Sequence, residues 1–265
     1  MVKRPGPDVA LIPGDSDFSP GVIRFSFLVV RPDARPVERP QARVWIARSR
    51  TAKPFAEATA RLEPVGVPGV SGPAAGDVTS VYVVRFRAPA PGRYWIAAEP
   101  VGGRPIQGFY AIDVKPRSSS PAVGARAPAS GTPTLASTHG DVGSLTTRTP
   151  PDRALLRYSV AGSLAAHAPF VVVFATPKFC TSRTCGPVVD VVDYVRRQSP
   201  SGIRFIHVEV YTRNDPRLGF NRWMRQWHLQ SEPWVFLVGR DGRIKAKFEG
   251  SVSAAELAAA VRRDL

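Results

Sequence analysis

The chain contains 265 residues, of which 43% are hydrophobic and 22% are charged, and this composition excludes a wholly disordered protein. Its 27 prolines exclude an all-helical bundle or a coiled coil, because proline interrupts long helices. The net charge of +15 is spread along the chain as +6, +2 and +7 over residues 1–115, 116–150 and 151–265. Nucleic-acid binders usually concentrate their charge on one face, so we expect no nucleic-acid partner.

Residues 1–115 predict a domain made of short strands. Apolar residues alternate with polar ones, as at Phe25, Phe27 and Val29, and clusters of proline and glycine separate the segments. This pattern is typical of an antiparallel sandwich. The stretch 91–96 (PGRYWI) resembles the late strands of immunoglobulin-like domains, which implies an N-terminal all-β immunoglobulin-like sandwich serving as a scaffold or, alternatively, as a binding module. The predicted strands are residues 9–12, 21–30, 41–48, 55–63, 79–87, 92–99 and 106–115.

Residues 116–150 are predicted to be a linker. Of these 35 residues, 26 are Ser, Thr, Pro, Gly or Ala, and none is aromatic. Such a segment has little apolar surface with which to offset the entropy of ordering it. We therefore expect a protease to cut within residues 117–145 and to release two folded fragments.

Residues 151–265 change to a mixed pattern of helices and strands. The run 170–175 is continuously apolar, as in a strand buried on both faces. Four of the five valines in 188–195, at 188, 191, 192 and 195, form one apolar helical stripe. Asp-Gly at 241–242 is a strong hairpin signal. Together these signals predict a mixed sheet with helices on both faces. The predicted elements are a helix at 158–167, a strand at 170–175, a helix from 187, a strand at 203–210, a helix at 216–228, strands at 234–238 and 243–248, and a helix from 253.

This order of elements, with a cysteine pair after the first buried strand and a proline before the hairpin, resembles the thioredoxin fold over roughly residues 155–265. The residues that carry the resemblance are 174–180 (FATPKFC), 185–187 (CGP) and 231–234 (SEPW). The resemblance implies a C-terminal α/β thioredoxin-like domain (residues 151–265) of the bacterial envelope type. It also implies that Cys180 and Cys185 exchange disulfides with substrates, and that Pro233 shapes the substrate groove.

The spacing of the cysteines departs from the two intervening residues of thioredoxins, because four residues separate them here. In a continuous helix, Cα atoms five residues apart are about 8–9 Å from each other, whereas a disulfide needs less than ~7 Å. The pair can therefore bridge only if residues 180–185 are not helical throughout. Position after the strand favours Cys180 as the attacking sulfur, whereas a helix N-terminus favours Cys185. We favour Cys180 as the exposed sulfur and treat the pair as one redox unit.

Three more residues are expected to act near the pair. Glu232 precedes Pro233, and its carboxylate would raise the pKa of a neighbouring thiol or accept its proton. Arg183 would favour the thiolate. Trp234 would line the substrate groove, with packing in the core as the alternative.

Alternatives to thiol–disulfide exchange stay open at this point. A non-catalytic envelope binding module would use the bond between the cysteines as a structural brace. A peroxiredoxin-like peroxidase would need Pro seven and Thr or Ser three residues before Cys180, where this chain has Val173 and Pro177. Sco-type copper chaperones add a distant histidine, but His207 and His228 lack metal-ligand spacing. We expect neither a cofactor nor a metal.

The expected partners are protein thiols or disulfides and an unidentified electron-donor protein. No run of the sequence approaches the ~20 apolar residues of a transmembrane helix. A sandwich joined to a thioredoxin-like domain resembles extracytoplasmic proteins and implies a location in the cell envelope. A cytoplasmic location is the alternative, because the sequence shows no export signal at its start.

Overall fold

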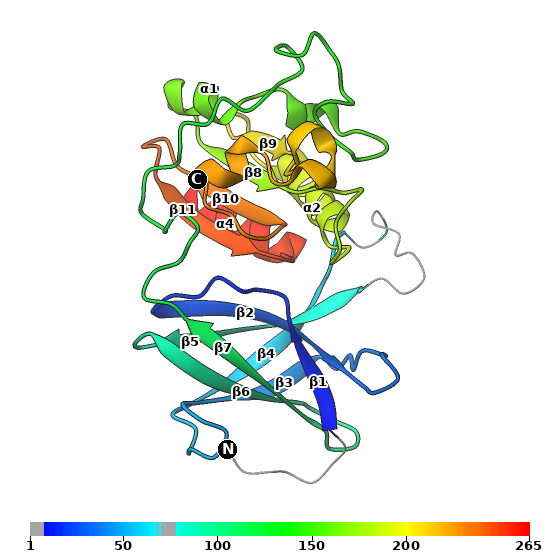
Figure 1. Cartoon of the computed structure of the whole chain (residues 1–265), viewed down its shortest axis with the longest axis vertical. Coiled ribbons are helices and arrows are strands. Elements are labelled where there is room, and N and C mark those ends of the chain that lie inside the picture. The colour runs from blue at the N-terminus through cyan, green and yellow to red at the C-terminus, as the bar shows by residue number, and fades with distance from the viewer. Residues whose placement is uncertain (1–7, 68, 70–77) are drawn as a thin grey trace. The chain divides into compact units, whose positions relative to one another are not determined.

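The computed structural model of the chain describes residues 8–67, 69 and 78–265 (Figure 1). The chain divides into two compact units, of which the first comprises Met1–Pro64 and Ser80–Ser118 and the second comprises Val65–Thr79 and Ser119–Leu265. Among the described residues, the first unit contains strands alone, and the second combines strands with short helices.

The strands of the first unit form a closed barrel in the order β1-β2-β5-β4-β3-β6-β7 (Figure 1). Neighbours along this order are antiparallel, and a parallel pairing of β1 with β7, in which Asp8 lies opposite Gln107, closes the barrel. Phe25, Phe27 and Val29 of β2 point into its core, as their alternation predicts. The strands are β1 (Asp8–Pro13), β2 (Gly21–Val30), β3 (Gln41–Ala47), β4 (Ala56–Pro64), β5 (Ser80–Ala88), β6 (Gly92–Pro100) and β7 (Gln107–Val114).

The barrel shows that the prediction of an immunoglobulin-like sandwich is wrong. Every predicted strand of residues 1–115 overlaps an observed strand. Period-two alternation occurs in sandwiches and in barrels, because a strand of either has one inward and one outward face. The two architectures differ in whether the sheet closes, and here the pairing of β1 with β7 closes it.

The second unit is built on a four-stranded sheet in the order β11-β10-β8-β9. β8 is parallel to β9 and antiparallel to β10, and β10 is antiparallel to β11. The predicted hairpin at residues 241–242 joins the last two strands. The elements are α1 (Val160–Ala165), β8 (Phe170–Phe174), α2 (Cys185–Gln198), β9 (Arg204–Val208), α3 (Arg222–Gln226), β10 (Trp234–Val238), β11 (Ile244–Glu249) and α4 (Ala254–Asp264), with short 3-10 turns at Arg153–Leu156, Thr212–Asn214 and Pro216–Leu218.

Helices cover both faces of this sheet. Val171 and Val173 of β8 belong to a buried cluster with apolar residues of α2 and α4. Phe170, Val172 and Phe174 of the same strand belong to a second cluster with residues of α1 and α3. The strand is therefore buried on both faces, which explains its continuous apolar run.

The prediction of a C-terminal α/β thioredoxin-like domain is wrong as a fold class. The described structure is mostly β, with a closed seven-stranded barrel and a small four-stranded sheet. It has only four α-helices, of which α1 and α3 contain six and five residues. The predicted order of elements does occur along residues 151–265. Element order is a weak criterion, however, because different folds place short helices against a mixed sheet.

Residues 119–150, here called the 119–150 segment, hydrogen-bond to the rest of the second unit. The backbone N–H of Ala127 donates to the carbonyl of Gly242 at 2.9 Å. Ser130 Oγ accepts a hydrogen bond from Trp227 Nε1 at 3.0 Å. The division into residues 1–115, 116–150 and 151–265 stays a prediction, but these contacts give the 119–150 segment a structural role within the second unit.

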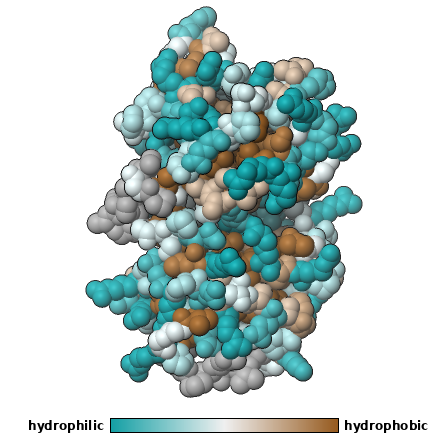
Figure 2. All heavy atoms as spheres, turned by 180° about the vertical axis from the view of Figure 1, so that it is seen from behind, coloured by the Kyte–Doolittle hydropathy of each residue, from teal (hydrophilic) through white to brown (hydrophobic). Residues whose placement is uncertain are grey.

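The surface carries both hydrophilic and hydrophobic side chains. On the face seen in Figure 2, hydrophilic side chains cover most of the surface, and hydrophobic ones appear between them. Within the described part of the chain, no helix combines the length and the apolar character needed to cross a membrane.

Two neighbouring carboxyl groups, one of them in α2, make the stability of the second unit depend on pH. Burial, followed by the hydrogen bond and the charge of Asp193, raises the pKa of Asp152 to about 6. Burial opposes ionisation of Asp193, but hydrogen bonds from Asp152 and Arg196 and the charges of Arg196 and Arg197 hold its pKa below the usual value. The folded state therefore keeps a proton on Asp152 between about pH 4 and pH 6, where the unfolded chain has lost it. Stability falls as the pH rises through this window.

We expect Asp152→Asn to stabilise the protein at pH 7 and to have no stabilising effect near pH 4. The amide of Asn donates to Asp193 without carrying a charge. The full pKa shift corresponds to about 3 kcal/mol, but partial exposure reduces the expected gain in the free energy of unfolding to about 1 kcal/mol. Urea unfolding of both proteins at pH 4 and pH 7 measures this gain. An equal gain at pH 4 would show that the charge of Asp152 is not the cause.

Candidate functional site

The two cysteines lie where β8 gives way to α2. β8 ends at Phe174, and the loop that follows turns back through a hydrogen bond from Arg183 N–H to the carbonyl of Cys180. α2 then begins at Cys185, so residues 180–184 lie outside the helix. The Cα atoms of Cys180 and Cys185 are 5.9 Å apart, and the two residues form a disulfide. This confirms the expectation that the pair can bridge because residues 180–185 do not form a continuous helix.

The two sulfurs have different surroundings. Cys185 is fully buried in the core between the sheet and α2, whereas Cys180 is half-buried at the edge of that core. The backbone N–H of Cys185, in the first turn of α2, donates to Cys180 Sγ at 3.2 Å. The hydroxyl of Ser182 lies 3.3 Å from the same sulfur. The hydrogen-bonding groups therefore converge on Cys180, the more accessible of the two sulfurs.

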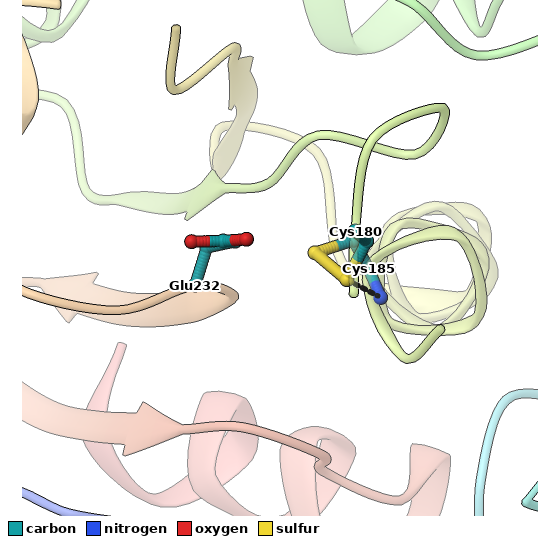
Figure 3. A group of neighbouring side chains, drawn as sticks. All are labelled: Cys180, Cys185 and Glu232. Atoms are coloured by element: carbon teal, nitrogen blue, oxygen red, sulfur yellow. Dashed lines mark hydrogen bonds between the residues drawn. A yellow bond between two sulfur atoms is a disulfide. The ribbon is translucent and has the colours of Figure 1, made fainter. Parts of the chain in front are cut away.

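Glu232 brings a carboxylate to the pair from the segment before β10 (Figure 3). One of its carboxylate oxygens and the two sulfurs all lie within 4.8 Å of one another. The side chain is partly buried, and this burial raises the pKa of its carboxyl group. Its peptide bond to Pro233 is cis. The structure therefore brings together Cys180, Cys185 and Glu232, three of the residues that the sequence singles out.

The other predicted site residues lie in different environments. Pro233 is buried next to Glu232. Trp234 is only 2% exposed, and its ring stacks on Phe236 while its Nε1 donates to Ser231 Oγ. Trp234 therefore packs in the core, which was the alternative given for it, and its role in a substrate groove stays a prediction. Arg183 is exposed at the loop tip with a left-handed backbone (φ 56°).

The two histidines considered as metal ligands do not join the cysteines. His207 is buried in β9, where its ring hydrogen-bonds to the carbonyl of Ala175 and to Thr146 Oγ1. Burial lowers the pKa of His207, so the ring is neutral at pH 7. His228 is exposed after α3. Neither belongs to the group formed by the cysteines and Glu232.

Thr147 is a contact of the cysteine loop that the sequence analysis did not find. Its Oγ1 accepts a hydrogen bond from the backbone N–H of Lys178 at 3.2 Å and donates to Glu209 Oε1 at 2.5 Å. Thr147 belongs to the 119–150 segment, whose composition predicted a linker. The segment thus supports the loop that carries Cys180, and no sequence signal marks this threonine among its many neighbours of the same type.

We expect Thr147→Val to loosen the cysteine loop with little change in side-chain volume. The substitution removes the acceptor of the Lys178 N–H and one donor to Glu209. The loss should lower the free energy of opening the loop by about 1 kcal/mol. Hydrogen exchange should show roughly fivefold faster exchange at the amide of Lys178. Thr181→Val, an exposed position in the same loop, is the control. Unchanged exchange in Thr147→Val would mean that the bond does not hold the loop.

A pocket of about 460 Å³ lies at the end of β9, and one residue of its wall contacts the loop that carries Cys180. Tyr211 lines this pocket, and its ring lies 6.5 Å from that of Phe179, which precedes Cys180. Burial, and then the charges of Glu232 and Glu209, raise the pKa of Tyr211. Arg213 and Trp223 form other parts of the wall. A recess with aromatic and cationic walls therefore adjoins the cysteine loop.

No protein-family model matches the sequence, and no curated protein is similar to it. The predicted thioredoxin-like and immunoglobulin-like memberships therefore find no support in sequence comparison either, and the function has to be inferred from the geometry of the site.

Proposed function

We propose that the protein carries out thiol–disulfide exchange with protein substrates through Cys180 and Cys185. The observation that supports this most is the hydrogen bond from the N–H of Cys185 to Sγ of the partly exposed Cys180. In the reduced protein, the same N–H at the start of α2 would stabilise a thiolate at Cys180. Accessible sulfurs with such stabilisation are the reactive ones, whereas buried thiols in apolar surroundings are inert.

Exchange with a substrate disulfide takes two steps. The Cys180 thiolate attacks one substrate sulfur, an S–S bond forms between them, and the other substrate sulfur leaves as a thiolate that takes up a proton. Cys185, deprotonated, then attacks Cys180 Sγ, which re-forms the internal disulfide and releases the second substrate thiol. Two electrons pass to the substrate, and a second protein dithiol returns them to the pair by the reverse steps.

An oxidising compartment suits this reaction. Disulfides persist outside the cytoplasm and are rare within it. The Cys180–Cys185 bond is compatible with an extracytoplasmic site of action, which we propose for this protein.

Equilibration with dithiothreitol buffers of graded potential tests the proposal. We expect a midpoint above about −300 mV and reversible reduction of the folded protein, because labile pairs lie above this value. A midpoint below it would indicate a structural bridge and would favour the rival function, a binding module without redox activity. Catalysed reduction of a disulfide-bonded peptide, compared with a Cys180→Ser/Cys185→Ser variant, measures the exchange itself.

A further inference from the structure

The reduced form of the cysteine pair has three potential metal ligands. Within the part of the chain that the structure describes, Cys180, Cys185 and Glu232 form the one group of three His, Cys, Asp or Glu residues able to converge on an ion. Figure 3 shows Glu232 on the segment before β10, separate from the loop of the cysteines, with one carboxylate oxygen on the side of the disulfide. In the oxidised pair, the electron pairs that would bind a metal are less available, because the sulfurs are neutral and bonded to each other.

We propose that the reduced protein binds one Zn²⁺ ion through Cys180 Sγ, Cys185 Sγ and a carboxylate oxygen of Glu232, and that oxidation to the disulfide releases the ion. The inference departs from the sequence-based expectation that the protein binds no metal. It rests on the proposed function in one respect, because the pair must be reducible in the folded protein.

The distances fit a tetrahedral zinc site after a small movement. Zn–S bonds of about 2.3 Å and Zn–O bonds of about 2.0 Å place the ligand atoms of a tetrahedral site roughly 3.5–3.8 Å apart. The three atoms here already lie within 4.8 Å of one another. Reduction lets the two sulfurs separate from bonding distance, and the loop at 180–184 can accommodate this because it lies outside α2. Water would complete the four ligands.

The ligand set selects zinc over the softer metals. Zn²⁺ accepts thiolate and carboxylate in one site. Cu(I) favours soft sulfur ligands, so the carboxylate of Glu232 would add little to its binding. Two thiolates and one carboxylate carry three negative charges, one more than the charge of Zn²⁺ neutralises. The positive end of the α2 dipole at Cys185 partly offsets this remaining negative charge. The partial burial of Glu232 also disfavours its isolated charge, and a bound cation would relieve this.

The redox and metal steps balance together. A dithiol reductant transfers two electrons and two protons to the Cys180–Cys185 bond and becomes a disulfide, leaving two thiols on the protein. Binding of Zn²⁺ then displaces the two thiol protons. A disulfide oxidant, such as a substrate of the proposed exchange, takes two electrons from the thiolates and two protons from water and becomes a dithiol. The Cys180–Cys185 bond re-forms, and Zn²⁺ is freed.

Titration of the full chain with ZnCl₂ against a chromophoric chelator tests the site. We expect the reduced protein to bind one Zn²⁺ per chain and the oxidised protein to bind none. CoCl₂ should give sulfur-to-cobalt charge-transfer absorption in the reduced protein only. Glu232→Gln should lower the Zn²⁺ affinity tenfold to a hundredfold while a thiol assay still counts two thiols. Glu57→Gln, an exposed carboxylate in the barrel, is the matched control and should bind as the unaltered chain does.

The outcomes separate this inference from the proposed function. A reduced protein that exchanges disulfides but binds no Zn²⁺ overturns the metal site alone. Binding that is equal in Glu232→Gln, or equal in the oxidised protein, also overturns the assignment. A pair that is reduced only when the protein unfolds overturns both proposals. Slower alkylation of the reduced pair in the presence of ZnCl₂, with recovery on adding a chelator, would support the site independently of the chelator titration.

Discussion

In the reduced state, we expect Cys185→Ser to keep a rapidly reacting thiol and Cys180→Ser to keep only a slowly reacting one. Cys180 is partly exposed, and its sulfur accepts a hydrogen bond from the backbone N–H of residue 185, which remains when the Cys185 side chain is substituted. Cys185 is fully buried at the first turn of α2, so a reagent reaches it only when the helix start opens. If that opening costs about 3 kcal/mol, iodoacetamide should alkylate Cys180→Ser roughly 100-fold more slowly than Cys185→Ser.

The same pair of variants distinguishes the attacking sulfur from the resolving one. Cys185→Ser should accumulate a mixed disulfide with a disulfide-bonded peptide, because nothing remains to resolve it, and Cys180→Ser should not. In urea, where burial is lost, the two variants should be alkylated at similar rates. If Cys180→Ser formed the mixed disulfide in the folded state, the roles of the two sulfurs would be reversed.

The strands of the barrel could be predicted, but its closure could not. Alternation at Phe25, Phe27 and Val29 depends on one strand having an inward face, and a local pattern suffices to show this. Closure depends on whether Asp8 meets Gln107, two positions that are distant in sequence. The same limit applies to the second unit, where element order along the chain was predicted and the assignment to a fold family was wrong.

The candidate site was predicted in its parts more than in its arrangement. The cysteine spacing indicated a loop before the helix, and the resemblance to thioredoxins, although wrong for the fold, implied that Glu232 before Pro233 lies beside the pair. The place of Cys180 after the strand favoured it as the more exposed sulfur, and packing in the core was one of the two interpretations of Trp234. The full burial of Cys185 depends on packing that the sequence does not encode locally. Thr147 could not be found at all, because a threonine in a segment rich in small polar residues carries no signal of its distant contact with Lys178.

The 119–150 segment is hydrogen-bonded to a fully buried tryptophan, so removal of that tryptophan should strongly destabilise the second unit. Trp227 lies between Phe174 and Phe236, with ring centroids 5.1 and 4.8 Å away, and its Nε1 donates to Ser130 Oγ. We expect Trp227→Ala to lower the free energy of unfolding of the second unit by about 3–5 kcal/mol, measured in urea. Trp223→Ala, within α3 and at a partly exposed position, should lower the free energy of unfolding by less.

Limited digestion with trypsin tests whether the 119–150 segment belongs to the second unit or is a flexible linker between two domains. Arg117 and Arg126 are both exposed, but Arg117 lies next to the boundary between the units, whereas Arg126 forms a β-bridge with Arg243. Cleavage requires the backbone to leave its hydrogen bonds, so we expect the chain to be cut after Arg117 well before Arg126, as mass spectrometry of the first fragments would show. In Trp227→Ala, loss of the anchor should expose Arg126 to cleavage as well. Equally rapid cleavage at both arginines in the unaltered chain would instead support the flexible linker predicted from composition, and the hydrogen bond from Lys178 to Thr147 would then have no fixed support from which to hold the cysteine loop.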